Sequence, residues 1–216
     1  MRVAAFLSVR RACGLVRQES EASSRISFEE FSALCRLWMA GRPVRTSDLA
    51  RWQRVLRPTM THRANHLEAL GLIERSAGSD DRRSVCCSLS GAGARRLEAD
   101  CDAICGRIGS GRPLSRCTPE RMVAVVSAMG QVALCSADLV VLGLLERGGS
   151  GTVGELVEEL GLLQPTVSMS VASLAAAGLV SRDAGKRGAI GLTEAGRFRA
   201  DDLASAIGSI VVRGIR

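Results

Sequence analysis

The chain has 216 residues, of which 46% are hydrophobic and 24% are charged, as in ordinary soluble globular proteins. No segment reaches the roughly 20 apolar residues of a membrane-spanning helix. With 3% aromatic residues and no tyrosine, the core must be built from leucine, valine and alanine. The net charge of +7 is uneven: residues 1–117 contain 20 arginines and 12 acidic residues, whereas residues 118–216 contain 9 basic and 10 acidic residues. A basic first half favours a polyanionic partner such as a nucleic acid.

The first predicted element is an amphipathic helix over residues 2–18, where apolar side chains recur at helical spacing. A polar stretch over 20–27 follows and is predicted to be a linker. Ser27 and Glu30 then resemble a capping box, in which the two side chains bond to each other's backbone N–H groups and open a helix. From there the first half is expected to contain helices over 28–40, 47–54, 58–70 and 91–109, and short strands over 44–46, 72–75 and 84–89.

The helices over 47–54 and 58–70 are separated by a tight turn and have clear boundary signals. Pro58 suits a first helical position, because its missing N–H would have no partner there. Gly71 suits the left-handed residue that commonly ends a helix. Turn-forming residues over 78–81 then predict a hairpin between the two following strands. Two short helices followed by a hairpin are the outline of a winged helix-turn-helix.

The second half begins after the clearest break in the chain, Gly109–Pro113. Thr118 is expected to cap, and Pro119 to open, a helix that extends to about Cys135. A glycine-rich turn is expected over 148–151. The other predicted elements are helices over 137–147, 153–160, 165–177 and 194–212, and a hairpin over 179–192.

This second half repeats the first. When residues 31–78 are shifted by 107 positions they meet residues 138–185 without a gap, and 13 of the 48 positions are identical. The identical pairs are Leu37/Leu144, Gly41/Gly148, Leu49/Leu156, Leu56/Leu163, Pro58/Pro165, Thr59/Thr166, Leu67/Leu174, Ala69/Ala176, Gly71/Gly178, Leu72/Leu179, Arg75/Arg182, Ala77/Ala184 and Gly78/Gly185. The period is too long for a solenoid repeat and indicates two copies of one small domain.

The expected fold class is therefore mainly α, with tandem winged helix-turn-helix domains whose wings are small β-hairpins. The predicted segments are an N-terminal helix and linker (1–27), a first winged domain with a long exit helix (28–109, here copy 1), a linker and connecting helix (110–135), and a second winged domain with a C-terminal helix (136–216, here copy 2).

The ordered motifs resemble the MarR family of bacterial transcription regulators. In copy 1 the matching segments are Ser47–Ala50, Leu56–Thr61, Leu67–Arg75, Gly78–Arg83, Leu89–Gly93 and Thr118–Arg121; in copy 2 they are Gln164–Ser168 and Leu192–Gly196. Many winged-helix families share the Leu-x-x-x-Gly-Leu signature, but the ordered set with Asp-Asp-Arg-Arg in the wing is more specific. The resemblance implies a sequence-specific DNA-binding repressor that a small apolar or phenolic effector releases from double-stranded DNA.

One feature departs from that family, whose usual chain carries a single winged helix and works as a homodimer. This chain carries two. We expect either a monomeric pseudo-dimer or a homodimer with four winged helices. In the pseudo-dimer, a shared helical base would be formed by residues 2–18, 91–109, 118–135 and 194–212.

Copy 1 is expected to be the main DNA reader, because the second helix of a helix-turn-helix enters the major groove. The candidate contact residues on this helix are Arg57, Thr59, Thr61, His62 and Arg63. Arginine reads guanine through two N–H groups, and threonine bonds phosphate or touches a thymine methyl group. In the wing, Arg82 and Arg83 are expected to reach the minor groove or the backbone. The alternatives are a solvated basic helix face and an ordinary charged hairpin.

Copy 2 presents a weaker DNA-binding surface. Its candidate residues are Gln164, Thr166, Ser168 and Ser170, with Lys186 and Arg187 in the wing. No charged residue occurs from 164 to 181, and the preceding helix carries Glu155, Glu158 and Glu159. Carboxylates beside a phosphate backbone oppose binding, since affinity depends on neutralising phosphates. We therefore expect an asymmetric protein in which copy 2 binds weakly or serves as a scaffold.

A second class of function stays open, namely a protein-interaction or scaffold module that no longer reads DNA. An enzyme is not expected, because the sequence has no Ser/His/Asp set, phosphate loop or acid–base pair. No Cys-x-x-Cys pair occurs and His62 and His66 are the only histidines, so neither a metal nor a cofactor is expected. Without a recognisable secretion signal, we expect a cytoplasmic location and eight reduced cysteines that serve in packing.

Overall fold

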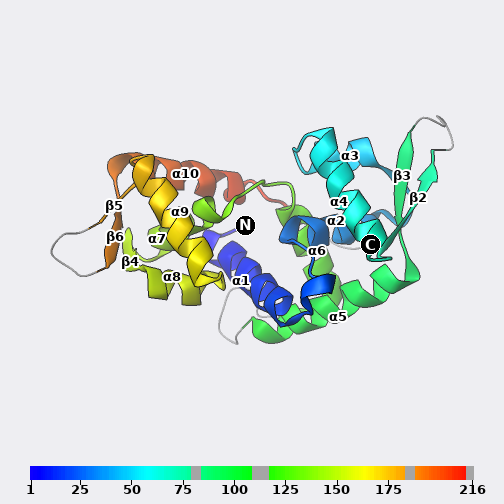
Figure 1. Cartoon of the computed structure of the whole chain (residues 1–216), viewed down its shortest axis with the longest axis horizontal. Helices are drawn as coiled ribbons and strands as arrows, with labels where there is room; N and C mark the ends of the chain where they lie inside the picture. The colour runs from blue at the N-terminus through cyan, green and yellow to red at the C-terminus, as the bar shows by residue number, and fades with distance from the viewer. Residues whose placement is uncertain (79–83, 109–116, 183–187, 213–216) are drawn as a thin grey trace. The chain divides into compact units, whose positions relative to one another are not determined.

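The structure is a computed structural model that describes residues 1–78, 84–108, 117–182 and 188–212. These residues are mainly helical with two small antiparallel sheets, which confirms the predicted fold class (Figure 1). The chain divides into two compact units. The copy-1 unit comprises Val16–Ala133 and Val211–Arg216, and the copy-2 unit comprises Met1–Leu15 and Leu134–Ile210. None of the described helices is both long enough and apolar enough to cross a membrane.

The copy-1 unit carries the first winged helix-turn-helix. A 3-10 turn, η1 (Ala22–Ser24), is followed by α2 (Phe28–Ala40), β1 (Val44–Arg45), α3 (Thr46–Trp52), α4 (Arg57–Ala69), β2 (Ile73–Ala77), β3 (Val85–Leu89), α5 (Gly91–Arg107) and α6 (Pro119–Met129). Helix α2 packs against α5 and α6, and α3 packs against α4, which in turn contacts β2. The largest fully buried side chains here include Leu34, Met60, Leu67, Leu97 and Met122. This arrangement holds α3 and α4 beside the wing strands (Figure 1).

The copy-2 unit repeats the same order. It contains α7 (Ser136–Glu146), β4 (Ser150–Thr152), α8 (Val153–Leu160), α9 (Gln164–Ala176), β5 (Val180–Arg182), β6 (Ala189–Leu192) and α10 (Glu194–Gly208). Helix α7 packs against α8, α9 and α10. The first part of α1 (Val3–Glu19) also belongs to this unit.

The two sheets have matching topology and register. Their strand orders are β1-β3-β2 and β4-β6-β5, with all pairs antiparallel. Ile73 faces Leu89 in the first sheet, and Val180 faces Leu192 in the second. The exit helix follows directly in each copy, so the hairpin fixes where that helix begins.

Helix ends follow the local signals in the sequence. Ser27 and Glu30 form the predicted capping box, with Ser27 Oγ accepting from the Glu30 N–H at 3.1 Å and Glu30 Oε2 accepting from the Ser27 N–H at 2.7 Å. Gly71 has φ +69° and Gly178 has φ +71°, as expected for left-handed residues after a helix. These positions favour glycine because other residues are strained there.

Each unit also contains a helix that precedes the other copy in the chain. Helix α6, which precedes copy 2, is buried from Met122 to Met129 in the copy-1 unit, and a Cβ on Gly130 just after it would lie 2.5 Å from Ser32 Oγ. Conversely, α1 lies in the copy-2 unit, where Arg11 Nε donates to the Glu158 carbonyl at 2.7 Å. The amino group of Met1 donates to the carbonyl oxygens of Gly208 and Ile210. In both cases the helix that precedes one copy in the chain belongs to the unit of the other copy.

Most element boundaries lie within two residues of the expectation, and three differences are described here. The helix expected to reach Cys135 ends at Met129, where the N–H of Gln131 bonds to the Ala128 carbonyl in a tightened last turn. The C-terminal helix ends at Gly208 rather than 212. The glycine-rich turn at 148–151 leads into a strand, β4, because backbone pairing with β6 is available to residues of any type.

Candidate nucleic-acid interface

Helices α3 and α4 of copy 1 separate their side chains into a buried and an exposed face. Leu49, Met60 and Leu67 are each at most 2% exposed and fix the two helices to each other and to the unit. The exposed face begins at the N-terminal turn of α4. The exposed residues include Arg57, Thr59, Thr61 and His62, four of the five residues predicted to contact DNA in this helix.

The start of α4 is built by backbone-restricting residues rather than by a side-chain cap. Leu56 occupies the cap position without a side-chain hydrogen bond, and Pro58 stands in the first turn. Thr61 Oγ1 donates to the Arg57 carbonyl at 3.0 Å. That bond orients the Thr61 side chain, while the Arg57 guanidinium extends from the exposed end of the helix.

Arg63, the fifth predicted reader, has a second role that the sequence did not reveal. Its Nη1 donates to Gln53 Oε1 at 2.6 Å. Gln53 is only 2% exposed, and its Nε2 donates to the Glu29 carbonyl at 2.6 Å and to Ser32 Oγ at 2.8 Å. This chain of bonds ties α4 to the end of α3 and to α2. Arg63 is half-buried and therefore positions the recognition helix as well as lying near its surface.

Gln53 is a buried residue at this site whose role in linking the helices was not predicted from the sequence. A signal was present in the repeat, because Gln53 corresponds to Leu160 in copy 2 and that leucine is buried at 3% exposure. A polar residue at a core position requires hydrogen-bond partners. Here those partners are Arg63, Ser32 and a backbone carbonyl.

The two histidines of α4 lie in different environments. His62 is exposed, whereas His66 Nδ1 lies 2.7 Å from Oε1 of the buried Glu30. Because the other oxygen of Glu30 serves the capping box, His66 links α4 to the start of α2. Within the part of the chain that the structure describes, no three His, Cys, Asp or Glu side chains are grouped so as to hold a metal ion.

Arginines surround the exposed end of α4. Arg51 has a side chain that is 77% exposed, with Nη1 3.1 Å from Asp48 Oδ1. Arg54 in the following turn is also exposed. No acidic residue occurs in the chain from Arg51 to Leu67, and Asp48, which pairs with Arg51, offsets only part of the positive charge.

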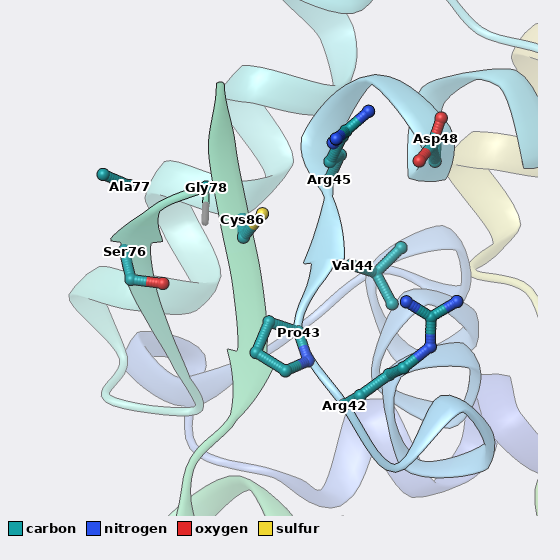
Figure 2. Close-up of a pocket in the computed structure, with 9 residues that line it drawn as sticks. All are labelled: Arg42, Pro43, Val44, Arg45, Asp48, Ser76, Ala77, Gly78 and Cys86. Carbon is teal, nitrogen blue, oxygen red and sulfur yellow. The ribbon is translucent and has the colours of Figure 1, made fainter. Parts of the chain in front are cut away.

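A cavity of about 480 Å³ extends the basic surface toward the wing. Figure 2 shows its lining, with Arg42 and Val44 on the approach to α3, Arg45 and Asp48 at the start of that helix, and Ser76 on β2. Two arginines and one aspartate give the lining a net positive charge. Its position at the wing sheet is compatible with an approaching phosphate backbone.

The corresponding helix in copy 2 presents a different surface. Gln164 and Ser168 are exposed and Thr166 is half-exposed, but Ser170 is only 5% exposed. Ser170 Oγ donates to Ser136 Oγ at 3.0 Å, so this residue packs within the unit and is removed from the candidate contact surface. Met169 is 74% exposed, and no residue of α9 is charged.

Acidic residues lie on α8, just before that helix. Arg147 forms ion pairs with Glu155 and Glu159. The N–H and hydroxyl of Thr152, followed by Arg147, lower the pKa of the Glu155 carboxyl, which therefore stays charged at neutral pH. Glu158 is exposed and occupies the position of Arg51. The negative charge beside α9 is thus only partly balanced.

The predicted wing contacts Arg82, Arg83, Lys186 and Arg187 lie outside the described residues. All eight cysteines are free thiols. Cys105 Sγ lies 2.7 Å from Cys117 Sγ, and burial, followed by the hydrogen bond to Cys117, raises the pKa of the Cys105 thiol far above its usual value. A thiol with a raised pKa is a poor nucleophile.

Comparison with known proteins agrees with this geometry. Two models of the MarR family match the chain, one over residues 26–85 and the other over residues 136–188, and each match falls on one winged helix-turn-helix. A search of curated proteins found no match. Together the two matches account for more than half of the chain. The chain therefore belongs to the MarR family of transcription regulators and contains two copies of that family's domain.

Proposed function

We propose that this protein is a sequence-specific DNA-binding repressor in which copy 1 is the main reader. The observation that carries the proposal is the exposed N-terminal face of α4, where Arg57, Thr59 and His62 are exposed and no acidic residue occurs in the chain from Arg51 to Leu67. In a helix-turn-helix this part of the second helix faces the base edges. A cytoplasmic location is part of the proposal, because a repressor must reach its DNA.

Within the groove, the side chains would have distinct tasks. Arg57 is the best candidate for base recognition, since an arginine bonds guanine O6 and N7 at once. Thr59 is placed to bond a phosphate or to contact a thymine methyl group. Arg63 keeps α4 at a fixed angle through Gln53, so its contribution to binding is mainly positional.

Copy 2 supports this reading by contrast. Gln164 has the chemistry to pair with adenine, but the carboxylates of α8 repel a phosphate backbone. Thr166 and Ser168 supply only neutral contacts. We assign copy 2 weak DNA binding or a scaffold role, with Lys186 and Arg187 as its candidate wing contacts.

Membership of the family supports two further parts of the proposal. A small apolar or phenolic effector would release the DNA by favouring a conformation that binds it less well. The active species would be either a monomeric pseudo-dimer or a homodimer of chains. Native mass spectrometry of the intact protein distinguishes the two.

The test is a salt titration of binding to DNA from upstream of the protein's own gene. We would compare the wild type with Arg57→Ala and with Gln164→Ala, its matched control at the same position of copy 2. We expect wild-type affinity to fall steeply with salt. Arg57→Ala should lose roughly tenfold to 100-fold of the specific affinity, and Gln164→Ala should stay within about threefold of the wild type.

A different result would favour the second candidate, a protein-interaction scaffold. The observation behind that candidate is the uncharged face of copy 2, where Met169 is 74% and Leu163 is 55% exposed. Wild-type binding that is weak at low salt and indifferent to DNA sequence would contradict the repressor. Equal losses in Arg57→Ala and Gln164→Ala would instead contradict the asymmetry between the copies.

A further inference from the structure

Arg54 has a backbone conformation that arginine rarely adopts. Its φ is +56°, and among the described residues no other non-glycine residue has a positive φ. The corresponding residue in copy 2 is Gly161, with φ +61°. The same turn is thus made by glycine in one copy and by arginine in the other.

The conformation is imposed by the end of α3. The N–H of Arg54 bonds to the Arg51 carbonyl at 3.2 Å, and the N–H of Val55 bonds to the Ala50 carbonyl at 3.0 Å. Closing a helix in this way requires a left-handed residue, which is usually glycine and sometimes asparagine. A side chain at such a position crowds the neighbouring carbonyl, so arginine is strained where glycine is not.

Space explains why copy 2 has glycine but not why copy 1 has arginine. A Cβ at Gly161 would lie 2.9 Å from the Arg11 carbonyl of α1, so the contact between α1 and α8 requires glycine. At Arg54 the side chain is exposed, and it forms no hydrogen bond or ion pair with any residue that the structure describes. No hydrogen bond or ion pair with the described residues therefore offsets the strain of the arginine backbone.

We propose that Arg54 is a phosphate-binding residue, kept in a strained turn for contact with the DNA backbone. It stands between Arg51 and Arg57 in the chain, all three side chains being exposed, and it directly precedes the helix that enters the groove. A phosphodiester bound there would fix the depth and angle of α4. This inference rests on the proposed function, and it adds a contact in the turn to those on the helix.

The test compares stability and DNA binding in the same variants. Arg54→Gly relieves the turn and removes the charge, so its melting temperature should rise by about 2–4 °C. Its affinity should fall by roughly threefold to tenfold, and the slope of log affinity against log salt should become shallower by about 0.9, the loss of one phosphate contact. Arg54→Lys should keep the wild-type slope.

Two controls separate charge from backbone effects. Asparagine tolerates the left-handed conformation without the flexibility of glycine. The slope of log affinity against log salt should therefore become as shallow in Arg54→Asn as in Arg54→Gly. Arg95→Ala removes an exposed arginine from α5, outside the helix-turn-helix, and should change the slope by less than about 0.3.

Each outcome has a definite meaning. If the wild type binds DNA and Arg54→Gly keeps its affinity and slope, the phosphate contact is wrong and the repressor proposal is unaffected. If Arg54→Gly melts at a lower temperature, the arginine supports the fold and the inference is also wrong. If the wild type shows no salt-sensitive binding, the proposed function fails and the inference fails with it.

Discussion

The two copies share a framework and differ on the surface that would meet DNA. Leu49 and Leu67 of copy 1, like Leu156 of copy 2, are buried at positions that the repeat keeps identical. By contrast, exposed Arg57 corresponds to Gln164. Residues that determine packing and backbone conformation are therefore retained, while residues that determine charge have diverged. The two copies therefore share a fold, but only copy 1 carries basic residues on its second helix-turn-helix helix.

At one position of the recognition helix, a residue predicted to contact DNA bonds within its own unit in both copies. Arg63 and Ser170 correspond in the repeat, and both bond within their own unit, to Gln53 and Ser136 respectively. The two side chains differ in charge but occupy the same inward-facing site. This comparison leaves the predicted DNA contacts of α4 and α9 mainly in the first two turns of each helix.

The largest predicted effect tests whether the frameworks are equivalent. A Cβ on Gly93 would overlap the Leu72 carbonyl oxygen, and one on Gly196 would overlap the Leu179 carbonyl oxygen. We expect Gly93→Ala and Gly196→Ala each to lower the free energy of unfolding by about 3 kcal/mol, because backbone must move to admit the methyl group. Urea unfolding followed by circular dichroism measures this change.

The matched control for these glycine variants is Gly91→Ala, whose added Cβ would approach only the end of the Arg95 side chain, at 3.7 Å. It should change the free energy of unfolding by less than about 0.5 kcal/mol. A large loss for Gly93→Ala with none for Gly196→Ala would show that the two exit helices pack differently.

The next effect concerns the wings and comes from the sequence alone. Reversing the charges in Arg82→Glu/Arg83→Glu should weaken DNA binding by roughly 30-fold, since two favourable phosphate interactions become repulsive. Lys186→Glu/Arg187→Glu should weaken it by less than about threefold if copy 2 stays clear of the DNA. Fluorescence anisotropy with one labelled duplex compares the two variants directly, and equal losses would overturn the asymmetry.

A smaller predicted effect is a pH dependence of stability that arises in the copy-2 unit and has no counterpart at the corresponding position of copy 1. Burial acts to raise the pKa of the Asp138 carboxyl, but the Arg199 guanidinium at 2.7 Å and the Cys135 N–H outweigh it, and the pKa falls below its ordinary value. A lowered pKa stabilises the fold at pH values above the unfolded pKa, and this stabilisation is lost as pH falls through the folded value. Asp138 corresponds to Phe31, which is buried in copy 1 and does not titrate.

Asp138→Asn should therefore lower the free energy of unfolding by about 1 kcal/mol at pH 7. The difference from the wild type should shrink as pH falls below about 4, because the carboxyl is protonated first in the unfolded chain and, at lower pH, in the folded protein. Urea unfolding at several pH values measures both. A difference that stays constant across this range would show that the Asp138–Arg199 ion pair does not stabilise the copy-2 unit.

Local features of the fold were predictable from the sequence, because they depend on near neighbours. Ser27 with Glu30 marked the start of α2, and Gly71 marked the end of the recognition helix. The repeat supplied the second domain. Burial of Ser170 and the bond between Arg63 and Gln53 were not predictable, because both depend on which way a helix faces within its unit.

The packing of α1 in the copy-2 unit was not predictable from the sequence for the same reason. Apolar periodicity shows that residues 2–18 form an amphipathic helix but not which domain covers its apolar face. In the structure, α1 packs closely against the end of α8, since a Cβ on Gly14 would lie 2.8 Å from the Gly161 carbonyl. A pair of glycines 147 positions apart carries no pattern that a single sequence can display.

The smallest predicted effect comes from giving copy 2 the arginines that it lacks. Glu158→Arg/Gln164→Arg gives copy 2 the residues found at Arg51 and Arg57 of copy 1. Both positions are exposed, and Glu158 offers only its backbone carbonyl to Arg11, so the substitutions should leave the fold intact. We expect affinity for nonspecific DNA to rise by roughly threefold to tenfold at low salt and the salt slope to steepen by up to about 2. An unchanged slope would mean that charge alone does not explain the difference in DNA binding between the copies. Copy 2 would then be held where it does not contact the phosphate backbone.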